Sequence, residues 1–231
     1  MSEETFVEAF FGDPERAARY AEGPRRVIPG FDTLHRMIAQ LLEERVGAAA
    51  RVLVLGAGGG LELCSFAAAQ PGWSFTGVDP SRPMLEQARA VLGDRARRVE
   101  FVDGFISDAP PGPFDAATCL LTLHLIPDDG RKLETLRGIH ERLTPGAPFA
   151  VVDNCIDTAA PDAEQQLQRY ARFAIESGLE AEQMEKWKEV AKSTLGLIGP
   201  AREEEILAEA GFTGTELFFA GLSWRGWITY A

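Results

Sequence analysis

Residues 56–60 read Gly-Ala-Gly-Gly-Gly, between a short apolar run and a segment with helical spacing. Glycine permits backbone conformations and close approaches that a Cβ atom would block. At the carboxyl end of a strand, such a loop lies where open α/β sheets bind ligands. Asp79 follows the second apolar run directly, placed to accept hydrogen bonds from ribose hydroxyls. Loop and acid together predict a cofactor that contains adenosine; the alternatives are a tight turn and a turn aspartate before Pro80.

The spacing of the glycines separates the possible cofactors. The nicotinamide fingerprint GxGxxG needs a glycine where Leu61 stands, whereas this loop reads GxGxG at Gly56, Gly58 and Gly60. A pyrophosphate also favours a positive group, and none flanks the loop. The sulfonium of S-adenosyl-L-methionine (SAM) is cationic and suits an acidic protein better. We therefore expect SAM as the cofactor and S-adenosyl-L-homocysteine (SAH) as the product.

Apolar runs alternate with helical segments along the chain. The pattern predicts strands at 51–55, 74–78, 99–103, 114–121 and 149–152, and helices at 61–70, 81–93, 129–143 and 201–210. Such alternation calls for a parallel sheet with right-handed crossovers. Two final segments, about 213–220 and 223–230, predict an antiparallel hairpin at the sheet edge. The predicted fold is α/β: a Rossmann-like, seven-stranded, mostly parallel sheet with an antiparallel last strand and helices on both faces.

The expected organisation is a single domain over residues 1–231. Residues 1–46 read as an N-terminal helical cap, and residues 160–196 as a helical insertion over the pocket. Apolar stripes at helical spacing in the insertion predict buried faces. Because helices inserted here must cover something, we expect Tyr170, Phe173 and Trp187 to wall a substrate pocket, with core packing as the alternative.

Charge and composition narrow the possible partners. The 23 Lys and Arg against 35 Asp and Glu leave a net charge of −12, which disfavours nucleic acid. Residues 2–4 are acidic rather than typical of a signal peptide, and no apolar run is long enough to span a bilayer. Widely spaced Cys64, Cys119 and Cys155 suggest reduced thiols. We expect a cytoplasmic monomer or homodimer that acts on a small molecule.

Four landmarks in order make the sequence resemble the class I SAM-dependent methyltransferases. They are VLVLGAGGGLEL (52–63), FTGVDPSRPMLEQA (75–88), FDAATCLLTLHLIP (114–127) and RLTPGAPFAVVD (142–153). Two further segments are similar to the carboxy-SAM synthase branch and its methyltransferase relatives: PRRVIPGFDTLHRMI (24–38) and EEEILAEAGFTGTELFF (203–219).

The resemblance implies a set of cofactor contacts. Gly56, Ala57 and Gly58 would line the methionine portion, Asp79 would bind the ribose, and the adenine would lie at two apolar residues. The full expected set is Gly56, Ala57, Gly58, Gly60, Asp79, Pro80, Phe105, Ile106 and Leu120. The family usually has an aspartate at the position of Phe105, for which Asp103 or Asp108 could substitute, and an acidic residue at that of Val54. These departures predict weaker cofactor contacts.

Three further departures concern the carboxylated cofactor. Where carboxy-SAM synthases have an arginine, a tyrosine and an asparagine, this chain has Ile206, Phe31 and Leu120. Burying a carboxylate without polar partners is costly. We therefore expect plain SAM and methyl transfer to a small organic acceptor by in-line displacement. The alternatives are a carboxy-SAM synthase-like enzyme of tRNA modification and a SAM-binding protein without turnover.

Two polar side chains follow the fourth and fifth expected strands. His124 is the candidate base, since its ordinary pKa near 6.5 suits proton transfer at neutral pH; a structural hydrogen bond is the alternative. Asp153 precedes Asn154, a pair similar to part of the magnesium site of some O-methyltransferases, but the second acidic ligand is not evident after strand four. We expect Asp153, with Phe31 and Ile206, in the substrate pocket, and no metal.

Overall fold

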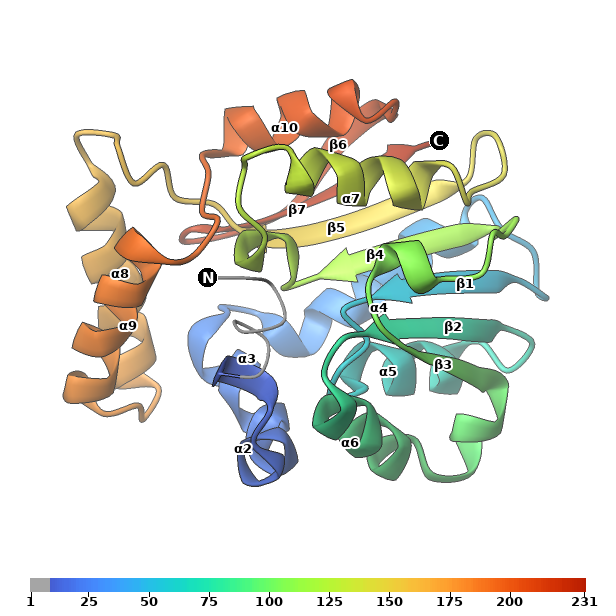
Figure 1. Cartoon of the computed structure of the whole chain (residues 1–231), viewed down its shortest axis with the longest axis horizontal. Coiled ribbons are helices and arrows are strands. Elements are labelled where there is room, and N and C mark those ends of the chain that lie inside the picture. Colours follow the sequence, from blue (N-terminus) through green and yellow to red (C-terminus); the bar gives the residue numbers. More distant parts are fainter. Residues whose placement is uncertain (1–8) are drawn as a thin grey trace.

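Seven strands form one sheet in the order β3-β2-β1-β4-β5-β7-β6 (Figure 1). The structure is a computed structural model that describes residues 9–231, so the acidic start at residues 2–4 lies outside the described residues. Strands β1 to β5 are parallel, and β7 runs antiparallel to both of its neighbours. The strands are β1 (Arg51–Leu55), β2 (Ser74–Asp79), β3 (Val99–Asp103), β4 (Ala116–Leu120), β5 (Pro148–Asn154), β6 (Thr213–Gly221) and β7 (Trp224–Tyr230). The predicted α/β sheet is confirmed.

Helices cover both faces of the sheet (Figure 1). One apolar cluster joins the sheet to α4, α5 and α6, and a second joins it to α7 and α10. The α-helices are α2 (Pro14–Arg19), α3 (Gly23–Val27), α4 (Phe31–Glu43), α5 (Leu61–Ala69), α6 (Arg82–Leu92), α7 (Arg131–His140), α8 (Ala163–Glu176), α9 (Ala181–Ser193) and α10 (Pro200–Glu209). The short 3-10 helices are η1 (Tyr20–Glu22), η2 (Gly93–Arg98), η3 (Ile106–Asp108) and η4 (Leu123–Leu125).

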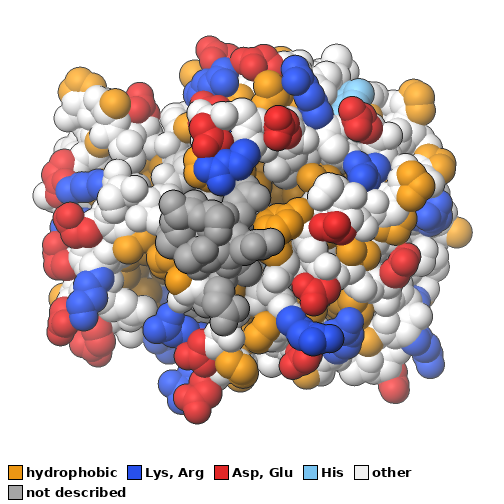
Figure 2. Space-filling view, viewed as in Figure 1, with side chains coloured by type: hydrophobic (Ala, Val, Ile, Leu, Met, Phe, Trp, Pro, Cys, Tyr) orange, Lys and Arg blue, Asp and Glu red, His pale blue; other side chains and the backbone are white. Residues whose placement is uncertain are grey.

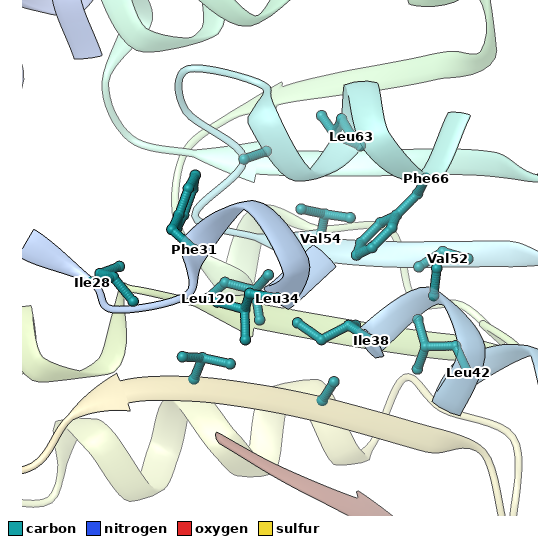
Figure 3. Packing of buried hydrophobic residues seen from close by; sticks show 14 of the residues in the cluster. Ile28, Phe31, Leu34, Ile38, Leu42, Val52, Val54, Leu63, Phe66 and Leu120 are labelled. Atoms are coloured by element: carbon teal, nitrogen blue, oxygen red, sulfur yellow. The ribbon is translucent and has the colours of Figure 1, made fainter. Parts of the chain in front are cut away.

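Burial on both faces explains why the central strands lack polar alternation. All seven residues of β5 and all five of β4 are buried, as expected for strands with helices above and below. Figure 3 shows how α4 contributes to this core: Leu34, Ile38 and Leu42 point from one side of the helix toward β1 and β4, with Phe66 of α5 beside them. Their spacing of about one turn puts the three leucine and isoleucine side chains on one helix face.

The last two strands refine the predicted hairpin. Strands β6 and β7 are antiparallel, as predicted, but β7 lies between β5 and β6, so that β6 takes the edge. The two-residue turn places Leu222 at φ +57°, in the left-handed region. Such turns match the twist of the flanking strands when the backbone adopts positive φ.

The N-terminal segment is folded as short helices. Asp13 caps α2 by accepting a hydrogen bond from the Glu15 amide, and Pro14 occupies the first helical position. Gly30, at φ +78°, precedes α4. Helix α2 packs against α6, so this segment lies beside the helices that flank the glycine loop.

Helices α8 and α9 pack against each other beside the end of the sheet where β5 finishes (Figure 1). Their apolar faces meet in a separate cluster with Leu167 and Ala191, and the rings of Tyr170 and Trp187 stack with centroids 3.9 Å apart. Within residues 9–231, none of the helices combines the length and the apolar character that a membrane span requires.

Candidate active site

A cavity of about 930 Å³ opens at the carboxyl ends of β1, β2 and β4. The sheet order makes β1 the point where connections change direction, and open α/β sheets bind ligands in the crevice there. The volume is within the range of small-ligand sites. Six residues of the predicted cofactor-binding set line this cavity: Gly56, Gly58, Asp79, Pro80, Phe105 and Ile106. Ala57, Gly60 and Leu120 do not line it, because Ala57 and Leu120 are buried and Gly60 packs on α6.

The glycine loop is shaped by its backbone and by the space around it. The Gly56 and Ala57 amides both donate to the carbonyl of Val78, so the loop turns over the end of β2. Gly56 has φ +78°, and a Cβ there would lie 2.0 Å from Oγ1 of Thr122. The loop thus needs glycine for its conformation and its packing.

Asp79 fixes the loop to the second strand. Its Oδ2 accepts a hydrogen bond from the Gly58 amide at 2.8 Å, and its Oδ1 accepts one from the Ser81 amide at 2.8 Å. Burial raises the pKa of Asp79 to about 6, while the two amide hydrogen bonds act in the opposite direction. Each oxygen still has a lone pair for a further donor, such as a hydroxyl group.

Residues of the N-terminal segment cover the loop. The ring of Tyr20 lies so close to Gly59 that a Cβ there would be 2.3 Å from Cδ1. Ser81 donates through its hydroxyl to the carbonyl of Phe11 at 2.7 Å, which fastens the segment to the start of α6. Phe11 and Tyr20 both line the cavity. Both belong to the segment 1–46 that the sequence predicts as an N-terminal cap, but the sequence pattern does not single out Phe11 as a wall residue.

A second wall of the cavity comes from η3 and α7. Ile106 packs against Gly138 of α7, where a Cβ would be 3.0 Å from the Ile106 side chain. Asp108, which the sequence offered as a polar substitute near Phe105, accepts the Phe105 amide at 2.8 Å and so caps η3. The basic wall residue Arg142 donates to the carbonyls of Ala109, Pro110 and Gly138.

The chain leaves β4 with a strained residue. Leu121 lies at φ +58° and lines the cavity, together with Thr122, Leu125 and Ile126. A non-glycine residue in the left-handed region costs free energy, and such strain concentrates at functional sites. The amide of Leu121 donates to the carbonyl of Val152 at 2.7 Å, which holds this turn against β5.

His124 and Asp153 meet beside this turn. Nδ1 of His124 lies 2.5 Å from Oδ1 of Asp153, and the imidazole side chain is 12% exposed. Since a carboxylate accepts, Nδ1 is the donor, and in a neutral imidazole of this tautomer Nε2 carries the lone pair. The edge of Trp224 packs on the imidazole at 5.5 Å between centroids. His124 does not line the cavity, but Thr122 and Leu125 on either side of it do.

A buried ion cluster stands behind this pair. Lys132 of α7 is fully buried, and its Nζ lies 3.9 Å from Asp153 Oδ2 and 3.7 Å from Oε2 of Glu203 on α10. The same Nζ donates to the carbonyl of Gly196 at 3.0 Å. Burial raises the pKa of Glu203, and Lys132 opposes that shift. The periodicity of α7 could have revealed the cluster, because Lys132 shares the buried face of Leu136 and Ile139.

The remaining predicted substrate residues lie elsewhere. Phe31 and Ile206 belong to the two apolar clusters on opposite faces of the sheet, so neither lines the cavity. Asp153 is buried beneath His124 rather than exposed in a pocket wall. The rings of Tyr170 and Trp187 stack on each other, and Phe173 is half-buried on α8. All three residues lie outside the lining of this cavity. The expectation that these residues wall this cavity is therefore corrected.

Within residues 9–231, no group of three His, Cys, Asp or Glu side chains is arranged to hold a metal ion. Cys119 and Cys155 are free and buried, and burial raises the pKa of both thiols. On the face in Figure 2, acidic and basic side chains are interspersed around apolar ones.

Comparisons with known proteins agree with this geometry. A family model described as a methyltransferase domain matches residues 53–149. The carboxy-SAM synthase of Chromohalobacter salexigens is 23% identical over 248 residues, covering 100% of this chain and 90% of the relative. The ubiquinone biosynthesis O-methyltransferase of Pseudomonas aeruginosa is 34% identical over 109 residues, covering 46% of this chain and 45% of the relative.

Two solved structures share the fold. Human N-acetylserotonin methyltransferase in complex with SAM gives a TM-score of 0.68 at 15% identity. Haemonchus contortus phosphoethanolamine N-methyltransferase 2, in complex with SAH and phosphomonomethylethanolamine, gives 0.71 at 16% identity. Each match covers 100% of this chain and 60% of the other structure's length.

The fold, the glycine loop and the matches together support a class I SAM-dependent methyltransferase, with the methyltransferase domain matched over residues 53–149. The site fits that cofactor on its own evidence. Gly56 and Gly58 bring backbone to the cavity wall, where any side chain would collide with Thr122 or Asp79, and each Asp79 oxygen has room to accept a ribose hydroxyl. Among the relatives, carboxy-SAM synthases match over nearly the whole length of the chain.

Proposed function

We propose that the chain transfers the methyl group of SAM to a small organic acceptor by in-line displacement. The observation that carries the proposal is the hydrogen bond from the Gly58 amide to Asp79, which places loop and acid together at the wall of one cavity. When bound, SAM supplies a methyl group on a cationic sulfur, a good leaving group. The chain supplies position, and positioning two reactants can contribute several kcal/mol to catalysis.

Each wall of the cavity has a part in this proposal. Gly56 and Gly58 hold the methionine portion, Asp79 accepts hydrogen bonds from the ribose, and Phe105 and Ile106 pack on the adenine. These residues lie at or just beyond the carboxyl ends of β1, β2 and β3. The net charge of −12 and the interspersed charges in Figure 2 favour a small acceptor over a nucleic acid.

His124 does not itself line the cavity, but its neighbours Thr122 and Leu125 do, and we propose it as the base for acceptors that lose an O–H or N–H proton. Asp153 holds Nδ1 as a donor, which leaves Nε2 to take the proton. Lys132 neutralises part of the negative charge beneath it. His124→Gln should lower turnover of such an acceptor while leaving SAM affinity unchanged, and an equal loss of both would refute the role.

The test of the cofactor is a calorimetric titration of the full chain. Micromolar binding of SAM should be lost in Asp79→Ala and kept in Asp94→Ala, an exposed aspartate in η2. NAD should give no heat. Absence of SAM binding by folded protein would refute the proposal.

A carboxy-SAM synthase-like activity is the second candidate, favoured by the match along the whole chain. Tighter binding of carboxy-SAM than of SAM would support it. Binding of SAM without turnover across a broad screen of acceptors would instead indicate a SAM-binding protein without catalysis.

A further inference from the structure

Position 54 lacks the acidic residue that the resemblance leads one to expect before the glycine loop. Val54 is fully buried in β1, and its register partner in the neighbouring strand β4 is Thr118. Residues paired in register point to the same face of a sheet. Thr118 is itself fully buried, and its hydroxyl donates to Oε1 of Glu62 at 2.7 Å. A carboxyl group therefore lies beside Val54, although a different element supplies it.

Glu62 lies at the start of α5, close to the glycine loop in the chain, and is not itself among the residues that line the cavity. It occupies the first turn of α5, two residues after Gly60, the last glycine of the loop, and is 7% exposed. Tyr20 and Asp79, which line the cavity, are close enough for Glu62 to act on their charge states. Two basic residues of the cavity wall, Arg131 and Arg137, belong to α7, and Arg142 follows that helix, on the side of η3.

We propose that Glu62, positioned by Thr118, supplies the negative charge that position 54 lacks and complements the cationic methionine portion of SAM. The proposal rests on SAM binding at the glycine loop. SAM has two positive groups, a sulfonium and an α-ammonium, whereas carboxy-SAM adds a carboxylate near the sulfur. A second carboxylate near Glu62 and Asp79 would be repelled, so Glu62 selects SAM over carboxy-SAM.

Burial gives this carboxyl a measurable signature. Burial raises the pKa of Glu62 to about 8, Asp79 raises it further, and the Thr118 hydrogen bond opposes both. The ligand-free protein thus holds a proton on Glu62 at pH 7. A cation beside it favours the carboxylate, so SAM binding releases that proton, and SAM affinity rises with pH by up to about tenfold per unit.

The titratable groups around Glu62 determine the pH range in which this proton release can be measured. Burial lowers the pKa of His35 on α4 to about 4 and holds the pKa of Asp79 at about 6. Burial raises the pKa of Tyr20 on η1 and of Cys119 on β4 above their ordinary values. The α-amine of the ligand titrates near 7.7 to 8.0. Among these groups, we expect Glu62 to be the source of the proton that SAM binding releases between pH 6.5 and 7.5.

The experiment compares the wild-type chain, Glu62→Gln and Glu44→Gln, an exposed control at the end of α4. SAM, SAH and 5′-methylthioadenosine are titrated by calorimetry at pH 6.5, 7.0 and 7.5, in buffers that differ in ionisation enthalpy, so that released protons are counted. Glu62→Gln should weaken SAM binding at least about tenfold and abolish proton release. Binding of 5′-methylthioadenosine, which lacks both cationic groups, should be unchanged.

The other ligands identify the cation and the selectivity. An equal loss for SAH places the α-ammonium at Glu62, whereas a loss confined to SAM places the sulfonium there. Preference for SAM over carboxy-SAM should shrink in Glu62→Gln. Thr118→Val, which keeps the carboxyl but removes its hydrogen bond, should give an intermediate loss and is the second variant should Glu62→Gln not fold.

Two results separate the possible failures. Equal SAM affinity and equal proton release in wild type and Glu62→Gln would overturn the role of Glu62 while leaving the site intact. Folded wild-type protein that binds none of the three ligands would overturn the site itself, and the role of Glu62 with it.

Discussion

Lys132→Met tests the buried ion cluster most directly. The substitution removes the cation between Asp153 and Glu203, two carboxyl groups that are buried with it. Methionine is of similar length, so the change leaves charge rather than volume unbalanced. Removing one partner of a buried ion pair costs about 3–5 kcal/mol, because the remaining charge has lost both water and its counterion.

The expected loss is large enough to measure by urea denaturation at pH 7.5. A loss of about 4 kcal/mol corresponds to a melting temperature lower by about 8–16 °C for a chain of this size. The deficit should shrink at pH 5.5, since burial raises the pKa of Glu203 to about 7 and its protonation relieves the uncompensated charge. The double variant Lys132→Met/Glu203→Gln should recover about half of the loss.

A loss below about 1 kcal/mol would refute this reasoning, because it would mean that Lys132 is not balancing buried charge. A double variant no more stable than Lys132→Met would equally contradict the pairing with Glu203. Arg36→Met on α4 serves as the control. It likewise replaces a long cationic side chain by methionine, but at a position that is not fully buried.

Three further predictions address the loop, the carboxyl behind it and the paired helices. Folding raises the pKa of Glu62 from 4.5 to about 8. The wild-type free energy of unfolding should therefore fall by about 2–3 kcal/mol between pH 6 and 8 relative to Glu62→Gln. The same pH dependence of this free energy in both proteins would contradict the prediction. Gly60→Ala should cost at least about 2 kcal/mol more than Gly93→Ala, because a Cβ at Gly60 would lie 2.8 Å from the α6 backbone whereas the space at Gly93 is open, and equal melting temperatures would refute the packing argument. Trp187→Ala should lower the free energy of unfolding by about 2–3 kcal/mol through lost stacking on Tyr170, yet leave the SAM dissociation constant unchanged. A weaker SAM affinity would show that Trp187 belongs to the binding site after all.

Much of the fold could be predicted because local pattern and tertiary arrangement agree. The runs at 51–55 and 99–103 are strands with the expected bounds, and Asp79 ends β2 as its spacing predicts. Glycine type and spacing also identified the loop. Each of these features depends on residues near one another in the chain, which is where sequence patterns carry most information.

The wider site could be predicted only in part, because helical stripes show which face is buried but not what covers it. Tyr170 and Trp187 have the predicted spacing, yet their rings pack on each other. Ile206 is placed by alignment near a ligand, but it belongs to α10 and its side chain lies in the apolar core. His124 and Asp153 were found separately, and the register of β4 with β5 brings them together.

The place of β7 in the sheet has a consequence for how the chain emerges from the ribosome. All seven residues of β5 are buried, and one edge of this strand pairs with β7. Trp224 follows Asn154 by 70 positions, so at 5–20 residues per second the free edge of β5 waits about 4 to 14 s for its partner. An unpaired apolar edge is a template for aggregation. Slower translation of residues 155–223 should therefore lower the yield of native protein, and truncation before β7 should yield insoluble chains.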